Sequence, residues 1–255
     1  MRKRLRTAML LLAPALAVAG CGDNRDHAGG SDETLLVFAA SSLTDAFADL
    51  DSAFELAHPG IEVQLNLAGS SALREQILDG APADVFASAN EPNMAEVVAA
   101  GEVRGRPVVF ARNLLEIAVP DGNPGNVTGL DDFADRSLLI GVCAAGVPCG
   151  DLAREAFASR GVSPSIDTNE PDVRALLTKI GADELDAGIV YTTDVRAADG
   201  LVEGIDIPEA HNAPATYLIA ELAGSPGSGA GEAFVDFVVS PEGRTILRSH
   251  GFASP

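Results

Sequence analysis

The chain has 255 residues, of which 47% are apolar, and it carries a formal net charge of -20. This length and composition support a packed core in one large domain or two lobes, and they exclude a largely disordered chain. The negative charge disfavours binding to nucleic acid or anionic lipid, and any anion site must depend on local hydrogen-bond donors.

The N-terminus has the pattern of a secretory signal. It begins with basic residues, continues with an apolar run over 8–19 and places small residues before Cys21. The run is too short to span a bilayer comfortably. Its ending resembles the bacterial lipoprotein box, in which the signal is cut before a lipid-bearing cysteine. We therefore expect a lipoprotein signal peptide over 1–20, a lipid on Cys21, a flexible tether over 21–33 and a location outside the cytoplasm. An ordinary signal peptide is the alternative.

A strand that runs directly into a helix opens the folded part. Residues 35–39 are apolar, and the pair Ser41-Ser42 separates them from a helical stripe of apolar residues. A serine at the N-cap would place its hydroxyl beside free backbone N–H groups at the positive end of the helix dipole, which favours anion binding. The same order recurs with an alternating strand over 61–67 and the pair Ser70-Ser71.

Strands and helices continue to alternate toward the C-terminus. Strands are predicted at residues 83–87, 114–119, 138–142, 187–190 and 215–222. Helices are predicted after Asn90 and at residues 152–157, 173–180, 232–239 and 241–250. This alternation indicates a parallel, helix-covered α/β sheet. A turn-rich restart after Asn113 suggests two α/β lobes joined by crossing strands, with 34–113 and 214–255 in the first lobe and 114–213 in the second.

Four short segments lie just before or within the first turn of a predicted helix, where backbone N–H groups lack intrahelical partners. They are Ser41-Ser42, Ser70-Ser71, Val147–Gly150 and Pro171–Val173. If their helices point at one cleft, neutral donors alone could hold a tetrahedral oxyanion. Taken singly, each segment is typical of an ordinary helix cap rather than of an anion site. Tyr191 ends an apolar strand and could add a phenol donor, although tyrosines commonly pack half-buried with a satisfied hydroxyl.

The cysteines and histidines argue against a metal centre or a catalytic thiol. Cys143 and Cys149 remain once Cys21 is assigned to lipid, and in an oxidising compartment this pair favours a disulfide. The four histidines are scattered without ligand spacing. A thiol-redox enzyme is the alternative, but its catalytic pair would normally show Cys-x-x-Cys spacing. We expect no enzymatic activity, no cofactor and no direct metal ligand.

Five motifs, taken in order, resemble the substrate-binding protein of the molybdate ABC transporter over residues 36–252. They are Val37–Thr44 (VFAASSLT), Gly80–Val85 (GAPADV), Pro171–Arg174 (PDVR), Gly188–Tyr191 (GIVY) and Gly251-Phe252. The resemblance implies a type II periplasmic-binding-protein fold, with two lobes that close by a hinge around molybdate or tungstate. It also implies a monomeric receptor that delivers the anion unchanged to a membrane permease.

The resemblance assigns the ligand donors residue by residue. It implies side-chain hydroxyls from Ser42, Ser70 and Tyr191 and backbone N–H groups from Val173 and Cys149. Many relatives have alanine at the place of Cys149, so the chain departs from the pattern there. A deprotonated dianion only accepts hydrogen bonds, so such donors satisfy it without a buried lysine or arginine. Sulfate has the same charge and shape, and a protein of the same fold that binds sulfate or another oxyanion is the alternative.

Overall fold

The structure is a computed structural model that describes residues 33–225 and 229–255. The predicted signal peptide, the lipid on Cys21 and all but the last residue of the predicted tether lie outside the described residues. Within the described ranges, no helix has both the length and the apolar character needed to cross a bilayer.

The first lobe is built on a five-stranded sheet in the order β2-β1-β3-β10-β4. These strands are β1 (Glu33–Ala40), β2 (Ile61–Ala68), β3 (Val85–Ser88), β4 (Val103–Asn113) and β10 (Ala215–Leu222). β1 pairs in parallel with β2 and β3, whereas β10 pairs antiparallel with β3 and β4. Apolar residues on both faces of β1 explain why the sheet is covered by helices on both sides.

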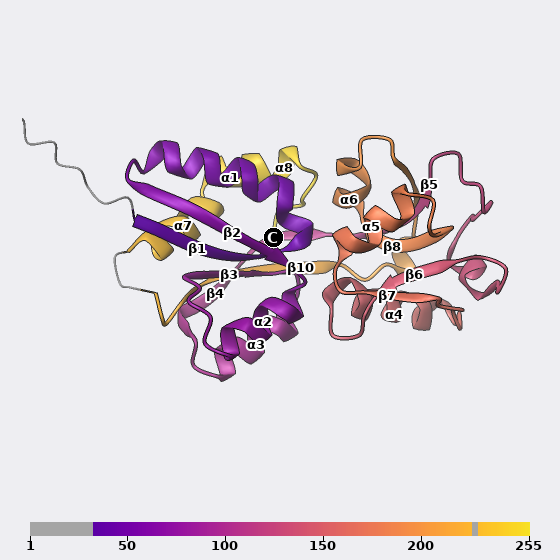
Figure 1. Cartoon of the computed structure of the whole chain (residues 1–255), viewed down its shortest axis with the longest axis horizontal. Helices are drawn as coiled ribbons and strands as arrows, with labels where there is room; N and C mark the ends of the chain where they lie inside the picture. Colours follow the sequence, from indigo (N-terminus) through magenta and orange to yellow (C-terminus); the bar gives the residue numbers. More distant parts are fainter. Residues whose placement is uncertain (1–32, 226–228) are drawn as a thin grey trace, which may run out of the picture. The chain divides into compact units, whose positions relative to one another are not determined.

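Helices cover both faces of the first sheet (Figure 1). On one face lie α1 (Thr44–Ala57), α7 (Ala230–Val239) and α8 (Pro241–Ser249), and on the other α2 (Ser70–Leu78) and α3 (Glu91–Ala99). Phe54 of α1 packs edge-on against Phe234 of α7 with ring centroids 5.1 Å apart, and both rings are fully buried. Burial of each such side chain stabilises the fold by about 2 to 3 kcal/mol. This packing fixes α1, which begins just after Ser42.

The second lobe contains a sheet in the order β7-β6-β8-β5-β9. Its strands are β5 (Leu115–Pro120), β6 (Ile140–Cys143), β7 (Thr168–Glu170), β8 (Ala187–Tyr191) and β9 (Val202–Asp206). Its helices are α4 (Pro148–Arg160), α5 (Val173–Gly181) and α6 (Thr192–Ala197). A Cβ atom at Gly188 would lie 2.8 Å from Ile180 Cδ1 of α5. The bare glycine therefore lets α5 pack close to the sheet, which sets the position of Val173.

Two segments carry the chain between the lobes. Leu114 alone separates β4 from β5, and residues 207–214 return the chain from β9 to β10. The Asn212 side chain donates to Leu115 O at 2.8 Å and accepts from Leu115 N at 3.0 Å. This amide holds the returning segment against the start of β5, so the two crossings between the lobes are tied together.

Several expectations need correction. The sheets are mixed rather than parallel, because β10 and β5 belong to the segments that cross between the lobes and run against their neighbours. Neither Ser41 nor Ser42 is the N-cap of α1: both lie in a 3-10 turn (Ser41–Leu43), and Leu43 precedes the helix without a side-chain cap. Thr44 Oγ1 instead donates to Ser41 O at 2.6 Å, which favours the tight turn.

Candidate functional site

All five donor residues expected from the sequence line one small cavity. Its walls come from both lobes, with contributions from Ala40, Ser41, Ser42, Gly69, Ser70, Ala89, Val147, Pro148, Cys149, Val173 and Tyr191. The centre of a water-sized sphere can move through about 10 Å³ of it. This is about the space that a single enclosed water molecule needs, so the cavity in this closed form excludes an extended substrate. Among the described residues, no lysine, arginine or histidine lines the cavity.

The hydroxyls of Ser42 and Ser70 each take part in one hydrogen bond within the protein. Ala89 N donates to Ser70 Oγ at 3.0 Å, and Ser42 Oγ lies 2.9 Å from Tyr217 Oη. A hydroxyl that accepts one hydrogen bond still has its own proton to donate. Ser70, the first residue of α2, therefore offers a proton to the cavity.

Tyr191 contributes a buried hydroxyl that lacks a partner. Its side chain is 1% exposed, and within the described residues no group forms a hydrogen bond with Tyr191 Oη. Burial raises the pKa of Tyr191 well above its ordinary value, and the nearby Tyr217, Asp194 and Asp151 act in the same direction. The phenol therefore stays protonated and is a permanent donor. Leaving such a group unsatisfied costs about 1 to 3 kcal/mol, so a ligand that accepts from it gains that amount.

Asp172 determines which backbone N–H groups at the start of α5 remain free. Its carboxylate accepts from Arg174 N at 2.8 Å and from Ala175 N at 2.9 Å. These bonds occupy the second and third N–H groups of the helix, whereas the N–H of Val173 at the first position has no intrahelical partner. Val173 N–H therefore remains for a ligand in the cavity.

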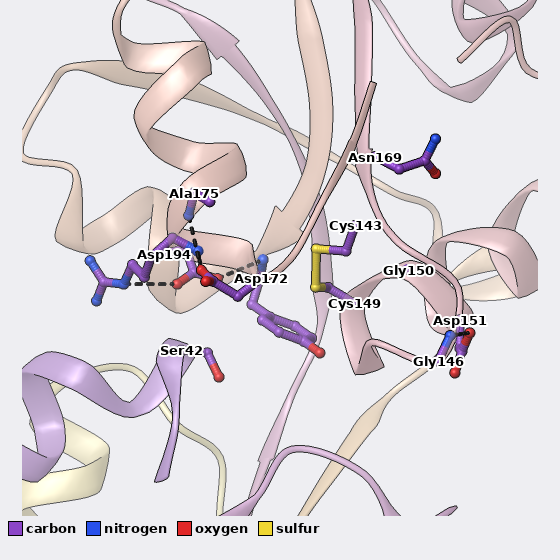
Figure 2. The surroundings of a disulfide bond; sticks show 12 residues. Ser42, Cys143, Gly146, Cys149, Gly150, Asp151, Asn169, Asp172, Ala175 and Asp194 are labelled. Carbon is purple, nitrogen blue, oxygen red and sulfur yellow. Dashed lines mark hydrogen bonds and ion pairs between the residues drawn. A yellow bond between two sulfur atoms is a disulfide. The ribbon is translucent and has the colours of Figure 1, made fainter. Parts of the chain in front are cut away.

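A disulfide fixes the second helix start. The predicted Cys143–Cys149 bond is confirmed, with Cα atoms 5.7 Å apart, and both side chains are buried. Figure 2 shows it joining the end of β6 to the first turn of α4. Cys149 is the second residue of α4, after Pro148, so its N–H also lacks an intrahelical partner. The cysteine that departs from the family pattern thus ties this donor to the sheet.

Charged residues lie beside the cavity rather than in it. A neighbouring pocket of about 140 Å³ shares Ser42 and is lined by Asp45, Arg174, Arg196 and His250. Arg174 pairs there with Asp45 and lies 3.5 Å from the buried Asp194, measured from Nε to Oδ1. Burial raises the pKa of Asp194 to about 7, although Arg174 and the Tyr191 backbone N–H oppose the shift.

Contacts between the lobes flank the cavity on two sides. Arg174 of α5 pairs with Asp45 of α1, and Asn93 Nδ2 donates to Gly146 O at 3.3 Å. A Cβ atom at Gly69 would lie 2.5 Å from Pro171 O. The lobes are therefore closed around the cavity.

Sequence reasoning did not identify Tyr217 or Asp194 as part of this region. Tyr217 sits in an apolar strand and reads as a core residue, and Asp194 follows a strand end without a motif. Neither carries a local signal, because their importance arises from neighbours far away in the chain.

Comparison with known proteins shows what this chain resembles. Residues 35–253 match the family model described as "Bacterial extracellular solute-binding protein". The chain is 35% identical over 252 residues to the molybdate-binding protein ModA of Mycobacterium tuberculosis, covering 96% of this chain and 97% of that protein.

Two solved structures share the fold. The periplasmic molybdate-binding protein of Azotobacter vinelandii has a TM-score of 0.77 at 19% identity and covers 87% of this chain and 99% of its own. The sulfate-binding protein SubI of M. tuberculosis has a TM-score of 0.76 at 17% identity and covers 87% of each chain. The expected type II periplasmic-binding-protein fold is thereby confirmed. The two scores are almost equal, so the fold alone does not separate the two anions.

Proposed function

This chain belongs to the bacterial extracellular solute-binding protein family, and on that premise we propose that it captures molybdate or tungstate outside the cytoplasm and delivers it to an ABC transporter permease. In this proposal the side chains of Ser42, Ser70 and Tyr191 and the backbone N–H groups of Cys149 and Val173 hold the anion. The protein binds and releases the anion without altering it.

The buried hydroxyl of Tyr191 is the observation that carries this assignment. It lines the cavity, stays protonated and has no partner in the described part of the chain. Buried polar groups are nearly always hydrogen-bonded, so an orphaned donor in a cavity points to a ligand that accepts. Ser70, whose oxygen is already occupied by Ala89 N–H, presents a second proton to the same space.

The donor set also indicates the charge state of the ligand. Each group assigned to it is a donor, and a fully deprotonated oxyanion offers only acceptors. A protonated phosphate would bring a donor of its own to a wall of donors, which disfavours it. Sulfate matches in charge and shape, so discrimination against it must come from the dimensions of the closed cavity.

Isothermal titration calorimetry with molybdate, tungstate, sulfate and phosphate tests the proposal. We expect saturable 1:1 binding of molybdate and tungstate that is much tighter than binding of phosphate. Tight binding of sulfate with no heat from molybdate would show that the protein serves a different oxyanion.

We further propose the arrangement of the rest of the chain. Residues 1–20 are the signal peptide, Cys21 carries the lipid anchor, 34–113 with 214–255 form the first lobe, and 114–213 form the second. The receptor acts as a monomer held at the membrane by its lipid alone. A role as a thiol-redox enzyme is not favoured, because Cys143 is fully buried and Cys149 is 2% exposed.

A further inference from the structure

We infer that Tyr217 is a positioning residue: it donates its hydroxyl proton to Ser42, so that Ser42 must donate its own proton to the bound oxyanion. The inference rests on the function proposed above and adds to it a determinant of specificity. Tyr217 lies in β10 and Asn113 at the end of β4, so both belong to the strands that lead between the lobes.

The amide of Asn113, on the strand β4 that pairs with β10, is oriented by a backbone donor. Leu114 N donates to Asn113 Oδ1 at 3.0 Å, and a backbone N–H cannot accept. Thr192 Oγ1 donates to the same oxygen at 2.9 Å. The orientation of the Asn113 amide is therefore fixed, with both lone pairs of Oδ1 used and both hydrogens of Nδ2 directed elsewhere.

The amide nitrogen of Asn113 donates to Thr193 Oγ1 at 2.8 Å. Because both lone pairs of Asn113 Oδ1 are used, Asn113 cannot accept the proton of the Tyr217 hydroxyl.

Among the described residues, the Tyr217 hydroxyl has one hydrogen-bond partner that can accept its proton, the hydroxyl of Ser42. Its side chain is fully buried, and Ser42 Oγ lies 2.9 Å from Tyr217 Oη. A buried hydroxyl proton without an acceptor is costly, so Tyr217 donates to Ser42. Ser42, itself 5% exposed, is left with its own proton, which it directs to an acceptor in the cavity.

This polarity favours an oxyanion that carries no proton. If Ser42 donated to Tyr217 instead, its oxygen would face the cavity as an acceptor and could receive a hydrogen bond from a protonated ligand. Donation from Tyr217 to Ser42 prevents this orientation. It gives Ser42 the same role that Ala89 N–H gives Ser70, because each serine oxygen receives a proton from the protein.

A double-mutant cycle tests the inference. Tyr217→Phe keeps the ring that packs against Phe110 and Phe252 but removes the hydroxyl. We expect it to weaken molybdate binding about tenfold, and we expect the Ser42→Ala/Tyr217→Phe double variant to bind within about twofold of Ser42→Ala alone, since Tyr217 acts through Ser42. The ratio of molybdate to phosphate affinity at neutral pH should also fall in Tyr217→Phe.

Phe110→Leu is the matched control, because it disturbs the same core without removing a hydrogen bond. It should lower the unfolding temperature and leave the affinity ratio unchanged. If Tyr217→Phe does not fold, Tyr217→Met, which also lacks the hydroxyl, takes its place in the cycle with Ser42→Ala and should show the same non-additivity. Independent, multiplicative effects, or a Tyr217→Phe protein with unchanged affinity and ratio, would overturn the inference alone. Failure of the unmodified protein to bind any of the four oxyanions would overturn the proposed function together with it.

Discussion

The carboxylate of Asp45 and the guanidinium of Arg174 form an ion pair that crosses from the first lobe to the second. Asp45 lies in the first turn of α1, three residues after Ser42, and Arg174 directly follows Val173. The pair therefore joins the two walls of the proposed anion site in the closed molecule.

Removal of this pair should favour the open state. Asp45→Asn is expected to raise the dissociation rate of molybdate up to about fivefold, because a partly exposed ion pair contributes up to about 1 kcal/mol. Stopped-flow measurement of ligand release checks it. Asp49→Asn is the matched control: Asp49 lies one turn further along α1 and pairs with His250 inside the first lobe. Equal acceleration in both variants would argue against a role for the inter-lobe pair.

The two serines should contribute comparably to affinity. Ser42→Ala and Ser70→Ala are each expected to weaken binding by roughly 1.5 to 3 kcal/mol, the range for hydrogen bonds to charged groups. Calorimetry with molybdate measures the loss. Ser71→Ala, which alters the next residue of α2 outside the cavity wall, should bind normally. Full affinity in both site variants would contradict the assignment.

Tyr191→Phe should change stability and affinity in opposite directions. Without ligand, the variant loses a buried hydroxyl that has no partner among the described residues, so its unfolding free energy should stay the same or rise by about 1 kcal/mol. With molybdate, the variant lacks a donor and should bind more weakly. Thermal unfolding with and without saturating molybdate provides both readings. A variant that is less stable without ligand yet binds normally would show that the hydroxyl has a structural partner instead.

The disulfide should stabilise the fold more than it changes binding. It closes a loop with a sequence separation of 6, and a short loop of this kind corresponds to about 2 kcal/mol. The double variant Cys143→Ala/Cys149→Ala should therefore unfold at lower denaturant concentration and retain molybdate affinity within about tenfold, because the proposed ligand contact at Cys149 is its backbone N–H. Loss of all binding in a folded double variant would mean that the bridge itself shapes the site.

Asp194 should make stability depend on pH. Burial raises the pKa of Asp194 from 3.8 to about 7. Between these values the folded protein holds a proton that the unfolded chain releases, so stability is highest near the acid end of the window and falls as pH rises to about 7. At about 1.4 kcal/mol per pH unit, the full effect is roughly 4 kcal/mol. Denaturant unfolding across this window should show a smaller slope in Asp194→Asn, whereas the exposed Asp121→Asn should retain the original slope.

Local patterns predicted much of the fold. The strand at 215–222 was expected with the bounds that β10 has, and α2 and α5 begin where the sequence put them. The helix expected at 152–157 begins earlier, at Pro148. Four strands and helices were not predicted: β4, β7, β9 and α6. β4 (VRGRPVVFARN) contains glycine, proline and charges that break the alternation, while the other three are too short to show a clear period.

Only part of the site could be predicted from the sequence, for a different reason. Residue type and helix position pointed to the segments Ser41-Ser42, Ser70-Ser71 and Pro171–Val173. The family resemblance singled out Ser42, Ser70 and Val173 as donors, but the convergence of these residues depends on tertiary structure. The contact between Ser42 and Tyr217 joins residues 175 positions apart. No local pattern encodes such a contact, and only the lobe topology brings it about.

The bare α-carbon of Gly69 has a consequence for the transport step. The carbonyl oxygen of Pro171 in the opposite lobe lies where the Cβ atom of a larger residue at position 69 would be. Any such residue would therefore keep the two lobes from closing completely. The proposed donors on each lobe would remain intact, but the two sets would not come together around the ion. A permease that recognises only the closed conformation would then fail to recognise a receptor that has ligand bound.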